Sequence, residues 1–260
     1  MSELKIEKSV RRGRPKRSEA ERFQTMAWYN SVSRYMGTNS PYALECQIQP
    51  ENIIKRHGKV ITSRAWDRYK IGARTPQDGL LKDEKKFSAV VAAERHVPMS
   101  GDVFRNPIWH AMKAKVLRFD EAVNLIVTLK PATAHLYIDL SDEMKCNRID
   151  SLFQNMGCPI WIERGDYFHA LDHLAVNLIF LRLEAKIPSE GVREGIAENI
   201  AKSLGPISQS PWINPFFEEM FDWLERNVWG TLFDEFYTTQ KWSNARGWRK
   251  TIPDWLIIED

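Results

Sequence analysis

Two histidines on one predicted helix have the spacing of metal ligands. His169 and His173 lie four residues apart in the stretch "HALDH", so they share a helical face, and Asp166 and Asp172 lie nearby. A zinc site needs at least a third protein ligand, and no HExxH motif, CxxC motif or neighbouring histidine supplies one. These histidines are therefore weak metal candidates, and polar positions on a buried helix are the stronger interpretation.

The same helix offers a second chemistry, that of a metal-dependent nuclease. Glu184 and Lys186, together with either nearby aspartate, mimic the carboxylate and lysine set of such enzymes. Those residues usually need a strand and a turn, whereas these all lie on one predicted helix. No glycine-rich phosphate loop, Ser/His/Asp set or Cys/His set stands out elsewhere. We therefore expect a protein without catalytic activity and without a cofactor.

The basic stretch "RRGRPKRS" (residues 11–18) has the composition of a segment that binds the minor groove of DNA. Arg12 and Arg14 can lie along the narrow, negative groove of A·T-rich DNA. Gly13 lets the backbone approach the groove floor, and Pro15 keeps the segment extended. The stretch therefore predicts a preference for A·T-rich duplexes, with a solvated or partner-binding tail as the alternative.

This segment resembles two kinds of known DNA-binding arm. The residues "RGRP" resemble the core of an AT-hook, and the basic residues that would contact phosphates beside it are Arg11, Lys16 and Arg17. The stretch also resembles the basic arms that precede the helical DNA-binding domains of some bacterial repressors. Both resemblances imply contact with double-stranded DNA.

A second stretch, "SRAWDRYKIGARTPQDGLL" (residues 63–81), resembles the end of the recognition helix and the following turn of Cro-type (XRE) helix-turn-helix domains. The matching residues are Trp66, Tyr69, Gly72, Arg74, Thr75, Pro76, Leu80 and Leu81. The resemblance implies that the helix start enters the major groove with Thr62, Ser63 and Arg64. It also implies that three cations lie near phosphates, namely Arg68, Lys70 and Arg74.

One departure from that family is visible in the sequence. The helix that should precede the recognition helix is represented by residues 43–45, and an insertion containing "QPENIIKRHGKV" separates it from Trp66. Either the loop between the helices is enlarged, or a different helical arrangement shares the turn. Trp66 and Tyr69 are better interpreted as core residues than as side chains that stack on bases.

Capping and turn signals predict a mainly helical chain. A capping box at residues 18–21 starts a helix that ends near Gly37. Further helices are expected at about residues 41–47, 63–71, 76–87, 120–130, 166–187, 189–204 and 214–229. Gly205-Pro206 is expected to close the helix before it. Residues 134–140 fit either a short strand or a buried helical turn, since periodicity does not decide at that length.

The charge of the chain divides at about residue 118. Residues 1–118 hold 24 Lys and Arg against 12 Asp and Glu, whereas residues 119–260 hold 13 against 22, and the total is +3. We expect a disordered basic arm (1–17), a basic helical DNA-binding region (18–118) and an acidic helical domain (119–260) that oligomerises or binds a partner. Uneven solvation of a single domain is the alternative.

Tryptophan is concentrated in the acidic part, which holds seven of the ten tryptophans after residue 160. The helix expected at residues 214–229 is apolar on more than one face, so it is covered either by its own domain or by another chain. Large aromatic side chains dominate both cores and interfaces. The candidate partner-binding residues are Trp223, Trp229, Trp242, Trp248 and Trp255.

These signals favour a bacterial-type helical DNA-binding protein, either a transcriptional regulator or a DNA-recruitment factor. One alternative is a non-catalytic adaptor subunit of a mobile-element or phage-defence complex that contacts DNA only electrostatically. Another is an enzyme with a site around His169 and His173. No apolar run approaches the ~20 residues that span a bilayer, so no membrane association is expected. The three cysteines form no pair of metal-ligand spacing, and we expect a reducing, cytoplasmic location.

Overall fold

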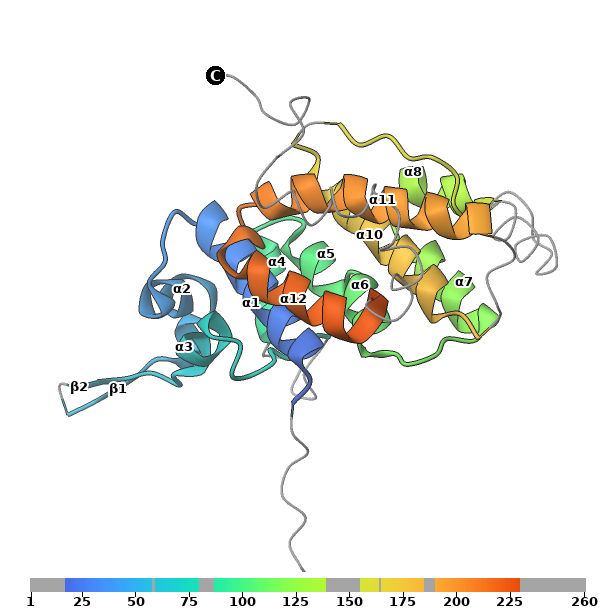
Figure 1. Cartoon of the computed structure of the whole chain (residues 1–260). Helices are drawn as coiled ribbons and strands as arrows, with labels where there is room; N and C mark the ends of the chain where they lie inside the picture. Colours follow the sequence, from blue (N-terminus) through green and yellow to red (C-terminus); the bar gives the residue numbers. More distant parts are fainter. Residues whose placement is uncertain are drawn as a thin grey trace, which may run out of the picture.

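A computed structural model of the chain describes residues 17–57, 59–79, 87–138, 155–163, 165–184 and 190–229. These residues are mainly helical, which confirms the expected fold class at that level (Figure 1). The helices of the first part are α1 (Glu19–Tyr35), α2 (Pro41–Ile48), η1 (Pro50–Asn52), α3 (Ala65–Lys70), α4 (Ala89–His96), α5 (Ser100–Arg105) and α6 (Ile108–Lys113). The remaining helices are α7 (Phe119–Val127), α8 (Pro131–Tyr137), α10 (Tyr167–Arg182), α11 (Glu190–Gln209), η2 (Asn214–Phe216), α12 (Phe217–Leu224) and η3 (Glu225–Trp229). Strands β1 (Ile54–Arg56) and β2 (Lys59–Ile61) form an antiparallel hairpin.

Several helices begin at the residues that local chemistry predicts. The hydroxyl of Ser18 accepts a hydrogen bond from the backbone N–H of Glu21 at 3.3 Å and caps α1. Ser40 caps α2 in the same way, and Pro41 occupies the first helical position. The carboxylate of Asp166 accepts from the N–H of His169 at 2.9 Å at the start of α10. These predictions hold because each depends on side chains within one helical turn.

Three predicted helix boundaries are wrong. The helix expected to reach residue 187 ends at Arg182, and Leu183 forms a parallel bridge with Leu117 instead. Helix α11 continues through Gly205 and Pro206 to Gln209, because Ile207 in its last turn is buried in the core and favours the helix there. The helix expected from Pro76 does not begin there, since residues 76–79 are not helical and Gly79 has a φ of +89°. Residues 80–86, where that helix was expected to continue, lie outside the described residues.

The described residues form two hydrophobic clusters that share α1. Phe23 and Ala27 belong to the larger cluster, whereas Trp28 and Val32, on other faces of α1, belong to a smaller one with Trp66. The larger cluster joins residues of α6 to residues of α10 and α11. It therefore crosses residue 118, and the boundary expected there does not separate two cores.

Helix α10 is the most deeply buried element of the larger cluster. Every residue from 170 to 180 is buried, as expected of a helix that is apolar nearly all round. It packs against α6 and α11, which lie beside it in Figure 1. None of the described helices combines enough length and apolar character to cross a membrane.

Helix α12 lies across α1, and this contact closes the larger cluster (Figure 1). The rings of Phe23 and Phe216 are stacked with centroids 5.7 Å apart, and Arg22 donates to Glu219 at 2.8 Å. The apolar side chains that face the core are Phe216, Phe217, Met220, Phe221, Leu224 and Val228. The chain itself therefore covers most of this apolar helix.

The tryptophans expected to bind a partner are described only in part. Trp223 is half-buried and packs against the larger cluster. The side chain of Trp229 and the whole of Trp242, Trp248 and Trp255 lie outside the described residues.

Candidate nucleic-acid interface

A β-hairpin and a short helix form a basic projection from the smaller cluster. Residues 53–74, here called the basic lobe, carry seven Lys and Arg residues and one acid, Asp67. Figure 1 shows the hairpin extending away from the helices beside α2 and α3. The lobe therefore presents positive charge on a feature that stands out from the body of the protein.

Helix α3 is attached to the body by its aromatic face. The ring of Trp28 on α1 lies 5.4 Å from Trp66 and 5.6 Å from Tyr69 between centroids. The indole N–H of Trp66 donates to the side chain of Gln49 at 3.3 Å. Trp66 and Tyr69 are thus core residues, as expected. Arg68 lies on the opposite face of this helix and is exposed.

The start of α3 is tied to α2 by a serine. The hydroxyl of Ser63 donates to the carboxylate of Glu45, which is buried on α2, and accepts from the N–H of Ala65 at 3.1 Å. Arg64, which follows, has a φ of 52° in the left-handed region and is exposed, and Thr62 is half-buried. Of the three residues expected at the helix start, Ser63 therefore has its hydroxyl engaged within the protein.

The basic lobe carries exposed cations, and no carboxylate of the described residues pairs with those whose side chains are described. Among the described residues, no ion pair is formed by Arg56, Lys59, Arg64, Arg68 or Arg74. Lys70 is half-buried and donates to the backbone carbonyl of Asn39 at 3.1 Å. Outside the lobe, several cations do form ion pairs with carboxylates: Arg22, Arg105, Lys113, Arg118 and Lys202. Arg34, Arg95 and Lys115 are also exposed without an ion pair to a described residue, but they lie far apart in the sequence, whereas five such cations lie within the lobe.

The turn after α3 packs directly on α1. Gly72 has a φ of +66°, and a Cβ atom there would lie 2.6 Å from Cγ and 3.0 Å from the carbonyl oxygen of Arg22. Both the backbone conformation and the close approach require glycine. The turn that carries Arg74 is consequently held against the first two turns of α1.

Arg17 holds this turn from the other side. Its guanidinium donates to the carbonyl oxygen of Gly72, to the hydroxyl of Thr75 and, at 2.9 Å, to the hydroxyl of Thr25. Arg17 was expected to contact phosphates, but the structure engages it with oxygens of the protein. The rest of the expected arm, residues 1–16, lies outside the described residues. The arm therefore joins the body beside the turn that carries Arg74.

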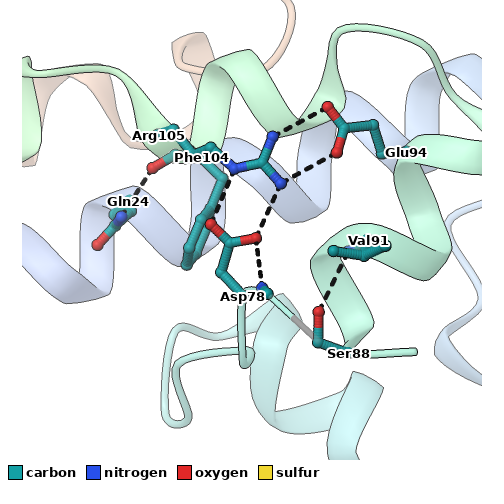
Figure 2. A network of polar contacts seen from close by, with 8 residues as sticks. Gln24, Asp78, Ser88, Val91, Glu94, Phe104 and Arg105 are labelled. Carbon is teal, nitrogen blue, oxygen red and sulfur yellow. Dashed lines mark hydrogen bonds and ion pairs between the residues drawn. The ribbon is translucent and has the colours of Figure 1, made fainter. Parts of the chain in front are cut away.

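A network around Arg105 fixes the segment that follows the turn (Figure 2). Nε and Nη2 of Arg105 each donate to Asp78 at 2.8 Å, and Nη1 and Nη2 each donate to Glu94 at 3.0 Å. These hydrogen bonds lower the pKa of Asp78. The side chain of Gln24 on α1 also donates to the carbonyl of Phe104 at 2.7 Å. The segment that follows the lobe is thus connected through Asp78 to α4 and α5.

The two candidate metal ligands form a hydrogen-bonded chain inside the core. Nδ1 of His173 lies 2.7 Å from the hydroxyl of Tyr137, and its Nε2 lies 3.0 Å from Nε2 of His169. Nδ1 of His169 lies 3.1 Å from the hydroxyl of Thr133. Each imidazole nitrogen thus faces a hydrogen-bond partner. In the part of the chain that the structure describes, no three His, Cys, Asp or Glu side chains come together as metal ligands.

Burial perturbs two neighbouring groups on α10. It lowers the pKa of His173 to about 4, with the neighbouring His169 as a further cause. It also raises the pKa of Asp172 to about 6, although Asn106 donates to that carboxylate at 2.7 Å. Asp172 and His173 are therefore buried groups within the core. Glu184 follows the end of α10, and Lys186, the lysine of the nuclease-like set, lies outside the described residues.

Sequence reasoning missed the hairpin, and with it Arg56 and Lys59. The signal was present in "IIKRHGKVI", where apolar ends enclose basic residues around His57-Gly58. His57 has a φ of 50°, as the first residue of a tight two-residue turn often does. The insertion that separates α2 from α3 is therefore a structured element that carries charge.

Comparison with known proteins gives no relative for this chain. No protein-family model matches it, and neither a curated protein nor a solved structure does. The function must be inferred from the side chains described above.

Proposed function

We propose that this chain binds double-stranded DNA through the basic lobe and the arm at residues 11–16, as a transcriptional regulator or a DNA-recruitment factor. The observation that carries the proposal is the set of five exposed cations without an ion pair on one projecting lobe. Such cations bind phosphates and release the counterions condensed on DNA, which favours association.

The position of the arm supports a contact that uses both elements. Arg17 attaches the arm beside Gly72 and Thr75, so the arm and the lobe can reach the same duplex. In this proposal the arm enters the minor groove. A helix-turn-helix-like unit of α2 and α3 faces the adjacent major groove with Thr62 and Arg64. The cations proposed to bind phosphates are Arg68, Lys70 and Arg74.

The acidic C-terminal part is proposed to bind a second protein or a second copy of the chain. Trp223 on α12 is only partly covered, and Trp161 is 83 % exposed. Exposed tryptophan side chains are favoured contacts in protein interfaces.

Fluorescence anisotropy with matched A·T-rich and G·C-rich duplexes tests the proposal. The double variant Arg64→Ala/Arg68→Ala should weaken binding about tenfold at physiological salt. It should also make the negative slope of log K against log salt less steep by about 2, since it removes two phosphate contacts. The control Lys115→Ala/Arg118→Ala removes two exposed cations outside the lobe and should leave both values unchanged.

Two results would contradict the proposal. Absence of binding by the unaltered chain to either duplex would rule out DNA binding. Equal weakening by the lobe variant and its control would show that only the net charge matters. That second result would favour the alternative, an adaptor that contacts DNA only electrostatically.

A further inference from the structure

The register of the hairpin places two pairs of side chains on one face. Ile54 lies opposite Ile61, and Arg56 lies opposite Lys59. Residues directly opposite in an antiparallel pair share a face, and so do residues two apart along a strand. The four side chains therefore share one face of the hairpin, with the charged pair nearer the turn. All four are exposed, Ile54 to 46 % and Ile61 to 49 %.

This arrangement of side chains destabilises the hairpin when the protein is unbound. Like charges directly opposite each other destabilise a strand pair, and neither cation forms an ion pair among the described residues. The exposed isoleucine pair adds an apolar surface without a cover, and a two-stranded hairpin is only marginally stable in water. A partner that supplies anions at the tip and an apolar surface below it would remove both costs.

We infer that the hairpin is a separate duplex-contacting arm, in which Arg56 and Lys59 bind phosphates and Ile54 and Ile61 lie against the sugars. The inference rests on the proposed DNA binding. Charge complementarity favours this partner, because regularly spaced phosphates suit two adjacent cations on a narrow ribbon. Three residues per strand reach about 10 Å, so the hairpin would extend the contact by about three base pairs.

The variant Arg56→Thr/Lys59→Thr removes both charges and keeps residues that favour strands. With an unaltered arm and α3, affinity should fall about tenfold, equally for A·T-rich and G·C-rich duplexes, since phosphates carry no sequence information. The negative slope of log K against log salt should become less steep by about 1.8. The shortest duplex bound with full affinity should become about three base pairs shorter. The control is again Lys115→Ala/Arg118→Ala.

The single variant Arg56→Glu separates contact loss from unfolding. A carboxylate opposite Lys59 should stabilise the hairpin, seen as slower amide exchange in β1 and β2, while DNA affinity falls. Loss of affinity with faster exchange would overturn the inference, because the hairpin would then act only through its own folding.

Different experimental results would overturn the hairpin contact and the proposed DNA binding. If the unaltered chain binds DNA and the hairpin variants bind with the same affinity, salt slope and minimal length, only the hairpin contact is overturned. Loss of self-association in those variants, with unchanged DNA affinity, would also overturn it and would indicate a second copy as the occupant. If the unaltered chain binds no DNA, both proposals fail.

Discussion

Arg105 faces Asp78 through two N–H···O hydrogen bonds of 2.8 Å, and the same guanidinium also bonds both carboxylate oxygens of Glu94. Two carboxylates from separate segments are thus held by one cation. Arg105→Gln should lower the free energy of unfolding by about 1 kcal/mol, a modest value because the groups are partly exposed. Urea denaturation would measure the loss, which should shrink at high salt.

The control for this network is Arg118→Gln, which removes two exposed ion pairs, with Asp120 and Glu121, at the start of α7 and should cost less. The lowered pKa of Asp78 also determines how the stabilisation by this network changes with pH. Because that pKa is lowered in the folded protein, the stabilisation is present above the ordinary value for aspartate and is lost as the pH falls below it. A network contribution that persists at pH 2 would contradict this account.

Gly72→Ala should destabilise the protein more than Gly37→Ala does. Both glycines have a positive φ, +66° and +64°, so both substitutions carry a backbone cost of about 1 kcal/mol. Only at Gly72 would the added Cβ also collide with Arg22, whereas nothing lies within 4 Å at Gly37. Thermal unfolding of the two variants measures the difference. Equal losses would mean that α1 and the turn can separate without cost.

Asp172 and His173 should have opposite effects on stability between pH 4 and 6. The pKa of Asp172 is raised to about 6, so the native state retains its proton, and this contribution to stability falls as the pH rises. The pKa of His173 is lowered to about 4, so the unfolded state binds the proton, and that contribution rises with pH up to about 6.5. In the unaltered protein the two effects largely cancel.

Single variants should reveal the pH dependence of stability that each of the two groups contributes. Relative to the unaltered protein, Asp172→Asn should gain stability with rising pH, and His173→Asn should lose it, each by about 1 kcal/mol per pH unit. Chemical denaturation at several pH values between 4 and 6 measures both slopes. Slopes of the same sign would show that burial does not dominate at one of the two positions.

Deletion of residues 1–16 should weaken binding to A·T-rich duplexes more than binding to G·C-rich duplexes. The deletion must stop before Arg17, because that side chain holds Gly72 and Thr75, and its loss would disturb the lobe as well. Arg12→Ala/Arg14→Ala should reproduce the selective loss in competition assays. Lys5→Ala/Lys8→Ala removes the same charge outside "RGRP" and should weaken both duplexes alike.

Local patterns in the sequence predict much of this fold. The caps at Ser18 and Ser40, the long buried helix after Asp166 and the core positions of Trp66 and Tyr69 all follow from nearby residues. The end of α11 was wrong because burial of Ile207, a tertiary effect, outweighs the local Gly-Pro signal.

The candidate site was less predictable because its geometry depends on distant pairs. Arg17 contacts Gly72 across 55 positions of sequence and Thr75 across 58. No pattern of spacing indicates such partners. The hairpin is different, since its apolar ends and its His57-Gly58 turn were readable.

Helix α1 contributes to both hydrophobic clusters, with Phe23 in one and Trp28 in the other. Neither cluster can open without uncovering side chains of its neighbour, so the two should unfold in a single cooperative transition. A ligand bound at the lobe would consequently raise the melting temperature of the entire described unit. A fragment cut at residue 118 would lose Phe216 of η2, which stacks on Phe23, so the lobe is not an excisable module.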